Sequence, residues 1–360
     1  MGSSPGAPEH HAGRFLATAR SHESRPRRPV TRVVLVTGTT LVPDDVVTLA
    51  GERGFEVRRV RQDVFTDDEL TAALDGVSGY LVGGYEEPTA EHLDAAKSLE
   101  VLGFVGTDFR AYVPGWRRAF EVGIAVVNSP GTNAVSVAEF TVRLALALAR
   151  PFPALDRPDA EPEPGIELAG RTLGILGAGR IGAHVARIAG AGLGMRVLYH
   201  APRRNWAFEA ATGTSYVTWD RLLGESEVLS LHRPGPDHGE PPLLDRAAFE
   251  RVRDGLLLVD TVHPGLVDPA ALAWAIRTRG VRAAFDADPA GEATAALLAL
   301  AAEPDVGATR LLVVPQSGFR THDANLRTAS VAMTATLDVL EGRPSEYVNN
   351  PDYLDRRAAR

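Results

Sequence analysis

Residues 170–182 read Gly170-Arg-Thr-Leu-Gly-Ile-Leu-Gly177-Ala-Gly179-Arg-Ile-Gly182, an apolar run that ends in glycines spaced Gly-x-Gly-x-x-Gly. The run predicts a buried strand, and the residues after it predict an amphipathic helix. Gly177 permits a tight turn, Gly179 lets the backbone approach a pyrophosphate, and Gly182 allows close helix–strand packing. Free N–H groups at the helix start then face the phosphates. We expect a nicotinamide dinucleotide here; the alternative is a glycine-rich turn without a ligand.

The residues after the next expected strand bear on the choice of cofactor. An acidic residue at that strand end accepts hydrogen bonds from the ribose hydroxyls of NAD and repels a 2′-phosphate. Here Ala201 stands at the strand end, and Arg203 and Arg204 follow with no acid between them. Because guanidinium groups pair well with phosphate, the sequence favours NADP over NAD. The alternative is that both arginines are solvated loop residues.

Short apolar runs alternate with helical periodicity on both sides of this motif, which predicts two parallel sheets covered by helices. The expected class is α/β with two Rossmann-like or flavodoxin-like domains. We assign residues 1–30 to a disordered tail and 346–360 to a C-terminal tail. The dinucleotide-binding domain is expected at 132–321. The substrate domain is expected to combine 31–131 with 322–345.

Composition narrows the class of protein. The 360 residues carry a formal net charge of −8, which argues against nucleic acid as a partner. No apolar stretch approaches the length of a membrane helix, and no secretory signal is visible, so we expect a cytoplasmic protein without membrane contact. Cysteine is absent, which excludes thiolate chemistry. No histidines show metal-ligand spacing beside a carboxylate, so we predict no metal.

Several blocks of the chain resemble the D-2-hydroxyacid dehydrogenases, the group of phosphoglycerate, glyoxylate and formate dehydrogenases. Residues 126–139 look like that family's hinge into the cofactor domain. The remaining matches are the HxP element at His232-Arg-Pro234, the NTARGGLVD-like block 260–268, the LDV-like block 284–286 and the PHxGxT-like block 315–321.

The resemblance implies hydride transfer between nicotinamide C4 and C2 of a small anionic 2-oxo or 2-hydroxy acid, in a cleft between the two domains. It also implies a homodimer formed through the cofactor domain, although the family's dimer arm is shortened and proline-rich at 151–169 here. The cofactor contacts that it implies, together with those of the glycine turn, are Gly177, Gly179, Arg180, Ile181, Gly182, Ala201, Arg203, Arg204, His232, Pro234, Thr261, Asp286 and Gly318.

The chain departs from the family at its three chemical positions. His263 stands where an arginine binds the substrate carboxylate, and imidazole has no two-pronged fork. Gln316 replaces the histidine that moves the proton, and an amide does not titrate. Gly291 falls at the place of the glutamate that pairs with that histidine, with Glu292 one step away. The candidate catalytic residues are therefore His263, Gln316 and Glu292, with His263 a hypothetical proton donor or a hydrogen-bonded loop residue.

The substrate loop also departs from the family's GVGxDxID. Gly106 and Thr107 are expected to offer backbone N–H groups to the substrate. Arg110 is a hypothetical substitute for the missing arginine, or a surface residue.

Three functions stay open on these residues. The first is an NADP-linked oxidoreductase with a non-standard proton donor. The second is a non-redox enzyme on the same scaffold, such as a lyase, an isomerase or an imine-handling enzyme. The third is a non-catalytic NADP-binding sensor. The first accords best with the match in the cofactor half, because hydride transfer depends mainly on positioning and a polarised carbonyl.

Overall fold

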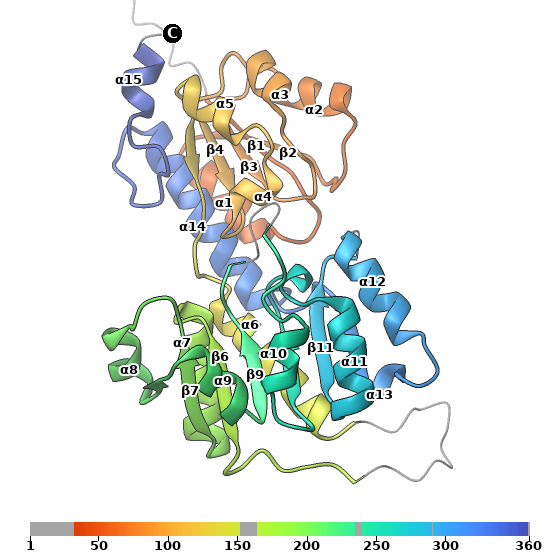
Figure 1. Cartoon of the computed structure of the whole chain (residues 1–360). Helices are drawn as coiled ribbons and strands as arrows, with labels where there is room; N and C mark the ends of the chain where they lie inside the picture. The colour runs from red at the N-terminus through yellow and green to blue at the C-terminus, as the bar shows by residue number, and fades with distance from the viewer. Residues whose placement is uncertain (1–31, 152–163, 235–239, 290, 359–360) are drawn as a thin grey trace, which may run out of the picture. The chain divides into compact units, whose positions relative to one another are not determined.

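The computed structural model describes residues 32–151, 164–234, 240–289 and 291–358. Within them the chain forms two parallel sheets, one of five strands and one of seven, and each is covered by helices on both faces (Figure 1). This confirms the predicted α/β class with two Rossmann-like domains. The expected N-terminal tail (1–30) and most of the shortened arm (152–163) lie outside the described residues.

The first sheet has the strand order β2-β1-β3-β4-β5, the flavodoxin-like order. Apart from the edge strand β2, its strands are buried apolar runs, as parallel strands covered on both faces require. The strands are β1 (Val33–Val36), β2 (Glu56–Arg59), β3 (Gly79–Val82), β4 (Val101–Phe104) and β5 (Ala125–Val127). The helices between them are α1 (Asp44–Glu52), α2 (Asp67–Leu74), α3 (Ala90–Ala95), α4 (Phe109–Tyr112) and α5 (Trp116–Glu121).

The second sheet has the order β12-β11-β10-β9-β6-β7-β8, which is a Rossmann order with its topological switch between β6 and β9. Its strands are β6 (Thr172–Leu176), β7 (Arg196–His200), β8 (Ser215–Tyr216), β9 (Val228–Leu231), β10 (Leu257–Asp260), β11 (Arg282–Ala287) and β12 (Leu311–Pro315). Its helices are α7 (Arg180–Arg187), the π-helix η1 (Ile188–Gly192), α8 (Trp206–Thr212), α9 (Trp219–Glu225), α10 (Arg246–Arg251), the 3₁₀ helix η2 (Pro264–Leu266), α11 (Pro269–Arg279), α12 (Glu292–Ala301) and α13 (Gly307–Arg310).

Two long helices connect the sheets in sequence. Helix α6 (Ala134–Ala149) leaves the first sheet and packs on β10 and β11 of the second. Helix α14 (His322–Leu340) leaves the second sheet and packs on β3, β4 and α1 of the first. The buried side chains of α14 include Ala332, Met333 and Leu340. The five-stranded domain is therefore built from both ends of the described chain.

The segment 346–360, expected to be a C-terminal tail, is attached to the first sheet over its described residues. Val348 forms an antiparallel bridge with Val127. The side chain of Asn350 accepts a hydrogen bond from Val126 N at 2.9 Å and donates one to Ile124 O at 2.8 Å. Helix α15 (Tyr353–Ala358) then packs beside α5. The sequence does not reveal this attachment, because scattered single contacts make it and no periodic pattern marks them.

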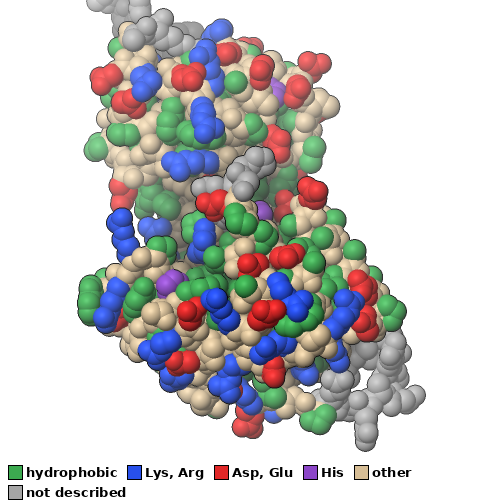
Figure 2. Space-filling model, in the orientation of Figure 1, with side chains coloured by type: hydrophobic (Ala, Val, Ile, Leu, Met, Phe, Trp, Pro, Cys, Tyr) green, Lys and Arg blue, Asp and Glu red, His purple; other side chains and the backbone are tan. Residues whose placement is uncertain are grey.

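Figure 2 shows acidic and basic side chains interspersed over the face in view. Many of them form ion pairs, for example Arg277 with Asp305 at 2.7 Å. Exposed pairs of this kind stabilise a fold by less than about 1 kcal/mol each. No helix in the described ranges has the length and apolar character needed to cross a bilayer.

Candidate active site

The glycine turn lies at the carboxyl end of β6, at the topological switch of the second sheet. Gly177 has φ +108°, and a Cβ there would lie 2.5 Å from the carbonyl oxygen of His232. A Cβ on Gly182 would lie 2.9 Å from Gly177 O. At Gly179, by contrast, a Cβ meets nothing within 4 Å. Two glycines therefore serve the fold, whereas Gly179 leaves open space above the backbone at the start of α7.

Two hydrogen bonds hold this turn, and His232 packs behind it. Gly177 N donates to His200 O at 2.8 Å, and the Asn205 side chain donates to Ala178 O at 3.3 Å. His232 is buried behind the turn, where its Nε2 meets the Ser230 hydroxyl at 2.8 Å. Burial lowers the pKa of His232 to about 3, so the ring is neutral at physiological pH. His232 is part of the wall and carries no charge to a ligand.

The two arginines after β7 have different environments. Arg204 pairs with Glu209 at 2.7 and 2.8 Å and stacks on Trp206. Its hydrogen bond to Glu209 raises the pKa of Arg204 and lowers that of Glu209. Arg203 is exposed, and no ion pair to it is found among the described residues. Ala201 is buried at the strand end.

These residues fit a dinucleotide. The pyrophosphate belongs over Gly179, where the N–H groups at the start of α7 are directed outward. Arg180 and Ile181 form the first turn of that helix. The side chain of Arg180 lies against Gly131, in the segment 126–139. A Cβ built on Gly131 would overlap the Arg180 Cδ, which shows how close the two residues are.

Two aspartates end adjacent strands on the far side of the switch. Asp260, at the end of β10, is buried and accepts hydrogen bonds from Val262 N and His263 N at 2.8 and 3.1 Å. Its Oδ2 has no partner. Burial, aided by the nearby charge of Asp286, raises the pKa of Asp260 to about 7, although the two backbone N–H groups act to lower it. Thr261 follows and shares a hydrogen bond with Thr141 at 3.1 Å.

Asp286, near the end of β11, clamps the loop that follows β12. It accepts hydrogen bonds from Ser317 N at 2.6 Å and Gly318 N at 2.8 Å. Burial raises the pKa of Asp286, which these two N–H groups oppose. The clamp fixes Gln316 beside the pocket with φ +30°, the one positive φ of a non-glycine residue in the described chain. Such a conformation is strained and persists where the surroundings enforce it.

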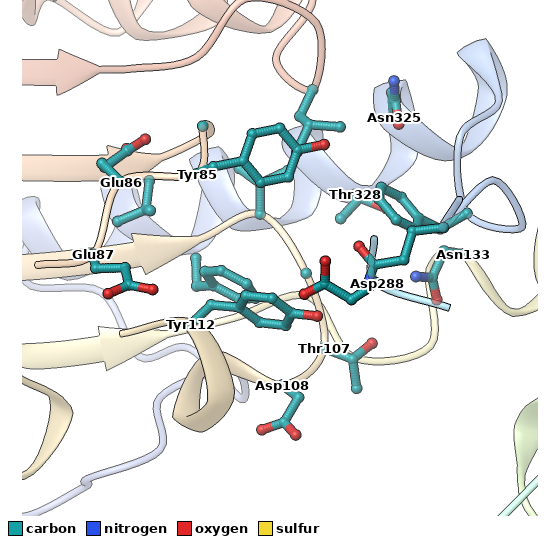
Figure 3. Close-up of a pocket in the computed structure, with 18 residues that line it drawn as sticks. Tyr85, Glu86, Glu87, Thr107, Asp108, Tyr112, Asn133, Asp288, Asn325 and Thr328 are labelled. Carbon is teal, nitrogen blue, oxygen red and sulfur yellow. The ribbon is translucent and has the colours of Figure 1, made fainter. Parts of the chain in front are cut away.

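A pocket of about 500 Å³ opens next to this loop (Figure 3). It is lined by loops at the carboxyl ends of parallel strands, where ligands bind in open α/β sheets. The first sheet contributes Leu41, Val82, Gly84, Tyr85, Glu86, Glu87, Phe104, Val105, Gly106, Thr107, Asp108 and Tyr112. The second sheet and the long helices contribute Asn133, Asp288, Gln316, Phe319, Asn325 and Thr328.

Tyr112 is the titratable side chain that meets Gln316. Its ring stacks on Phe104 at 5.8 Å, and the Gln316 side chain lies near its hydroxyl, where it acts to lower the pKa of Tyr112. Burial raises the pKa of Tyr112, and the neighbouring carboxylates of Asp288 and Asp108 raise it further. Figure 3 shows the hydroxyl end of Tyr112 directed toward Asp288. At neutral pH this group is a phenol that holds its proton.

Of the predicted catalytic and substrate residues, the pocket gathers Gly106, Thr107 and Gln316. In this structure Gly106 N donates to Phe104 O at 2.9 Å, so its N–H is engaged within the loop. Thr107 O accepts a hydrogen bond from Asn128 at 2.5 Å.

Three further candidates lie outside the pocket lining. Arg110 is exposed and sits 5.5 Å from the ring centres of Phe109 and Trp116, so it does not replace the missing arginine in this structure. His263 is exposed, and its Nδ1 accepts the Gly265 N–H at 3.0 Å. Glu292 is exposed at the start of α12. Pro234 is exposed beside the segment 235–239, which lies outside the described residues.

Sequence reasoning missed Tyr112, Asp288 and Glu86. Glu86 is 4% exposed and accepts hydrogen bonds from the hydroxyls of Tyr80 and Thr37. Its placement depends on side chains from two other strands, so no local pattern marks it. Asp288 is the one of the three that its sequence position could have indicated. It follows Asp286 by two residues, and a polar side chain just after a strand end faces the edge of such a sheet where ligands bind.

Comparison with known proteins settles the family. Residues 144–305 match the family model of the D-isomer specific 2-hydroxyacid dehydrogenase NAD-binding domain. A hydroxypyruvate reductase of Thermotoga maritima is 31% identical over 71% of this chain and 85% of its own length. A glyoxylate reductase of Aeropyrum pernix is 32% identical over 64% of this chain and 71% of its own length. The chain belongs to the D-isomer-specific 2-hydroxyacid dehydrogenase family.

Members of this family differ in length and detail. A D-3-phosphoglycerate dehydrogenase of Archaeoglobus fulgidus is 35% identical, but the match spans only 42% of that protein. The crystal structure of the TT0316 protein from Thermus thermophilus aligns with a TM-score of 0.71, 29% identity and coverage of 88% of this chain and 99% of that one. The resemblance of sequence that indicated the family is thus confirmed, whereas the comparisons leave the site residues untested.

Proposed function

We propose that this family member is an NAD(P)-dependent oxidoreductase that transfers a hydride between the nicotinamide and a carbon bearing a small oxo or hydroxyl group. The observation that carries the proposal is that the glycine turn and the pocket lie at the same edge of the second sheet. The open Gly179 turn ends β6, and the pocket adjoins the ends of β11 and β12 in the same sheet. The relatives named as glyoxylate and hydroxypyruvate reductases support this class of reaction.

We propose NADP as the preferred cofactor. The one acid near the expected ribose site, Glu209, is engaged by Arg204 and by the Tyr199 hydroxyl at 2.8 Å. It is therefore poorly placed to accept the ribose hydroxyls of NAD. Arg203 remains exposed at the same loop and matches a 2′-phosphate in charge.

Hydride transfer requires this chain to position the reacting groups and to supply one proton. The bound nicotinamide supplies the hydride or receives it. Asp286 holds the loop of Gln316, and Gln316 in turn orients the Tyr112 hydroxyl. In the reducing direction Tyr112 donates its proton to the carbonyl oxygen as the hydride reaches the carbon. Its 43% exposure lets solvent return the proton. Tyr112, rather than His263, then fills the place of the family's histidine.

The described lining of the pocket contains no arginine to receive the anionic substrate that the sequence predicts. We keep a homodimer through the seven-stranded domain as a proposal. Its test is the mass of the full chain in solution by light scattering.

Fluorescence titration of the full chain with NADPH and NADH tests the cofactor proposal. We expect tighter binding of NADPH, and Arg203→Ala is expected to weaken NADPH binding about tenfold, one lost charged contact, while leaving NADH nearly unchanged. Arg150→Ala, at an exposed position remote from β7, serves as the control for loss of an arginine. Absence of binding by both nucleotides would contradict the proposed function.

A further inference from the structure

The pocket lining is acidic, which is unusual for a family whose substrates are themselves acids. Its lining contains the carboxyl groups of Glu86, Glu87, Asp108 and Asp288. The same described lining contains no lysine, arginine or histidine. A carboxylate substrate would enter among groups of its own sign, with no guanidinium fork to receive it.

Glu86 supplies an independent observation at the wall of this pocket. Its Oε1 accepts hydrogen bonds from the hydroxyls of Tyr80, at 2.8 Å, and Thr37. Its Oε2 is buried without a partner, although the residue lines the pocket. Gly84 lies directly beside Oε2, since a Cβ built on Gly84 would overlap that oxygen. A buried acceptor left unpaired is costly, and a donor on a ligand removes that cost.

Aromatic side chains complete the lining. Tyr85, Phe104, Tyr112 and Phe319 line the pocket, and the Phe104 and Tyr112 rings are stacked nearly parallel at 12°. Aromatic faces attract cations through their quadrupole, and the attraction grows when water is excluded. Carboxyl groups and aromatic rings around one cavity are the surroundings that suit an ammonium ion.

We propose that this pocket receives substrates that carry a protonated amine beside the reacting oxo or hydroxyl carbon, and that Glu86 Oε2 accepts a hydrogen bond from the ammonium group. The inference rests on the proposed function, since it names the substrate class of the same site. The hydride passes to the carbonyl carbon, the carbonyl oxygen takes the proton, and the amine is unchanged by the step.

The competing outcome, a preference for an anionic substrate, depends on Arg320. It is exposed, follows the lining residue Phe319, and donates to the Tyr85 hydroxyl at 2.5 Å. An anionic substrate would need Arg320 to leave Tyr85 and reach into the pocket. Preference for an anion that disappears in Arg320→Gln would therefore overturn the proposal.

Turnover is tested with carbonyl compounds of matched size and different charge. The full chain with NADPH is given aminoacetone (cationic), hydroxyacetone (neutral) or pyruvate (anionic), and NADPH oxidation is followed. We expect kcat/KM for aminoacetone to exceed that for hydroxyacetone by about tenfold, as one charged hydrogen bond implies, with pyruvate lowest. Glu86→Gln keeps the shape of the side chain and should remove most of the preference for aminoacetone over hydroxyacetone. Glu52→Gln, on the exposed face of α1, is the matched control.

A binding experiment separates this inference from the proposed function. Calorimetry on the full chain without nucleotide compares benzylamine, benzyl alcohol and benzoate, whose common ring suits the aromatic lining. Tightest binding of benzylamine, lost in Glu86→Gln but kept in Glu52→Gln, supports the inference even if no NADPH is oxidised. Benzylamine that binds no more tightly than benzoate, or pyruvate as the best carbonyl substrate, overturns it while leaving hydride transfer intact.

Discussion

Asp260→Asn is expected to stabilise the protein, and to do so more strongly as the pH rises. The Asp260 side chain is 1% exposed and its Oδ2 is unpaired, so ionisation inside the fold is costly. Asn keeps an oxygen for the N–H groups of Val262 and His263. It also matches the asparagine of the family's NTARGGLVD block.

The magnitude follows from the pKa of Asp260, about 7 in the fold against a reference of 3.8. The folded state therefore binds more protons than the unfolded state between these values, and stability falls as the pH rises through that window. At 1.36 kcal/mol per pKa unit the full cost is about 4 kcal/mol. Roughly 2–3 kcal/mol of it develops between about pH 5 and about pH 8.

The assay is urea unfolding of the full chain and of Asp260→Asn at several pH values, because the difference between the two curves cancels every other titrating group. We expect the advantage of Asp260→Asn to be about 2–3 kcal/mol larger at about pH 8 than at about pH 5. Asp355→Asn makes the same charge change at an exposed position and should show no such growth. Unfolding free energies that differ by a constant amount at all pH values would refute the reasoning.

Three other predictions rest on single contacts. Gly179→Ala should leave the melting temperature unchanged, since a Cβ there meets open space, but should weaken NADPH binding, measured by fluorescence, at least about tenfold. Gly177→Ala should instead lower the free energy of unfolding by about 1–3 kcal/mol, because both the φ of +108° and the nearby carbonyl oxygen of His232 oppose a Cβ. Tyr112→Phe should reduce kcat by about 10²–10⁴ with NADPH affinity retained, whereas an unchanged kcat would exclude Tyr112 as the donor. Asn350→Ala should destabilise the five-stranded domain by about 2–4 kcal/mol in urea unfolding, because Val126 N and Ile124 O lose buried partners. Glu346→Ala, at an exposed position of the same segment, is its control.

The strands and the glycine turn were predictable because their signals are local. An apolar run such as 172–176 must be buried whatever surrounds it, and Gly177 needs its conformation within one turn. The two-residue strand β8 and the π-turn η1 were not predicted, since neither has a periodicity of its own. The attachment of the last segment through Asn350 also lacks a local signal.

The site was less predictable because its residues are selected by distant partners. Arg110 had the right charge for a carboxylate, but Phe109 and Trp116 hold it outside the pocket lining. Tyr112, two residues later, enters the lining through its stacking on Phe104 and its contact with Gln316. A sequence shows which groups are present in a loop, whereas packing against other elements decides which of them faces the ligand.

Of the six buried side-chain polar atoms without hydrogen-bond partners in the described residues, three lie at the edges of the proposed sites. Glu86 Oε2 lies at the pocket, His232 Nδ1 lies behind the glycine turn, and Asp260 Oδ2 lies beside the Asp286 clamp. Each costs stability in the protein alone, and proteins break the rule of satisfied polar groups mainly where function requires it. The three positions also differ in what removes the cost of the unpaired polar atom. Asn at position 260 retains the oxygen that binds Val262 N and His263 N, so that site is a defect of stability. Glu86 lines a cavity and its unpaired Oε2 is buried in the wall, so in our proposal the ammonium group of a ligand supplies the missing donor.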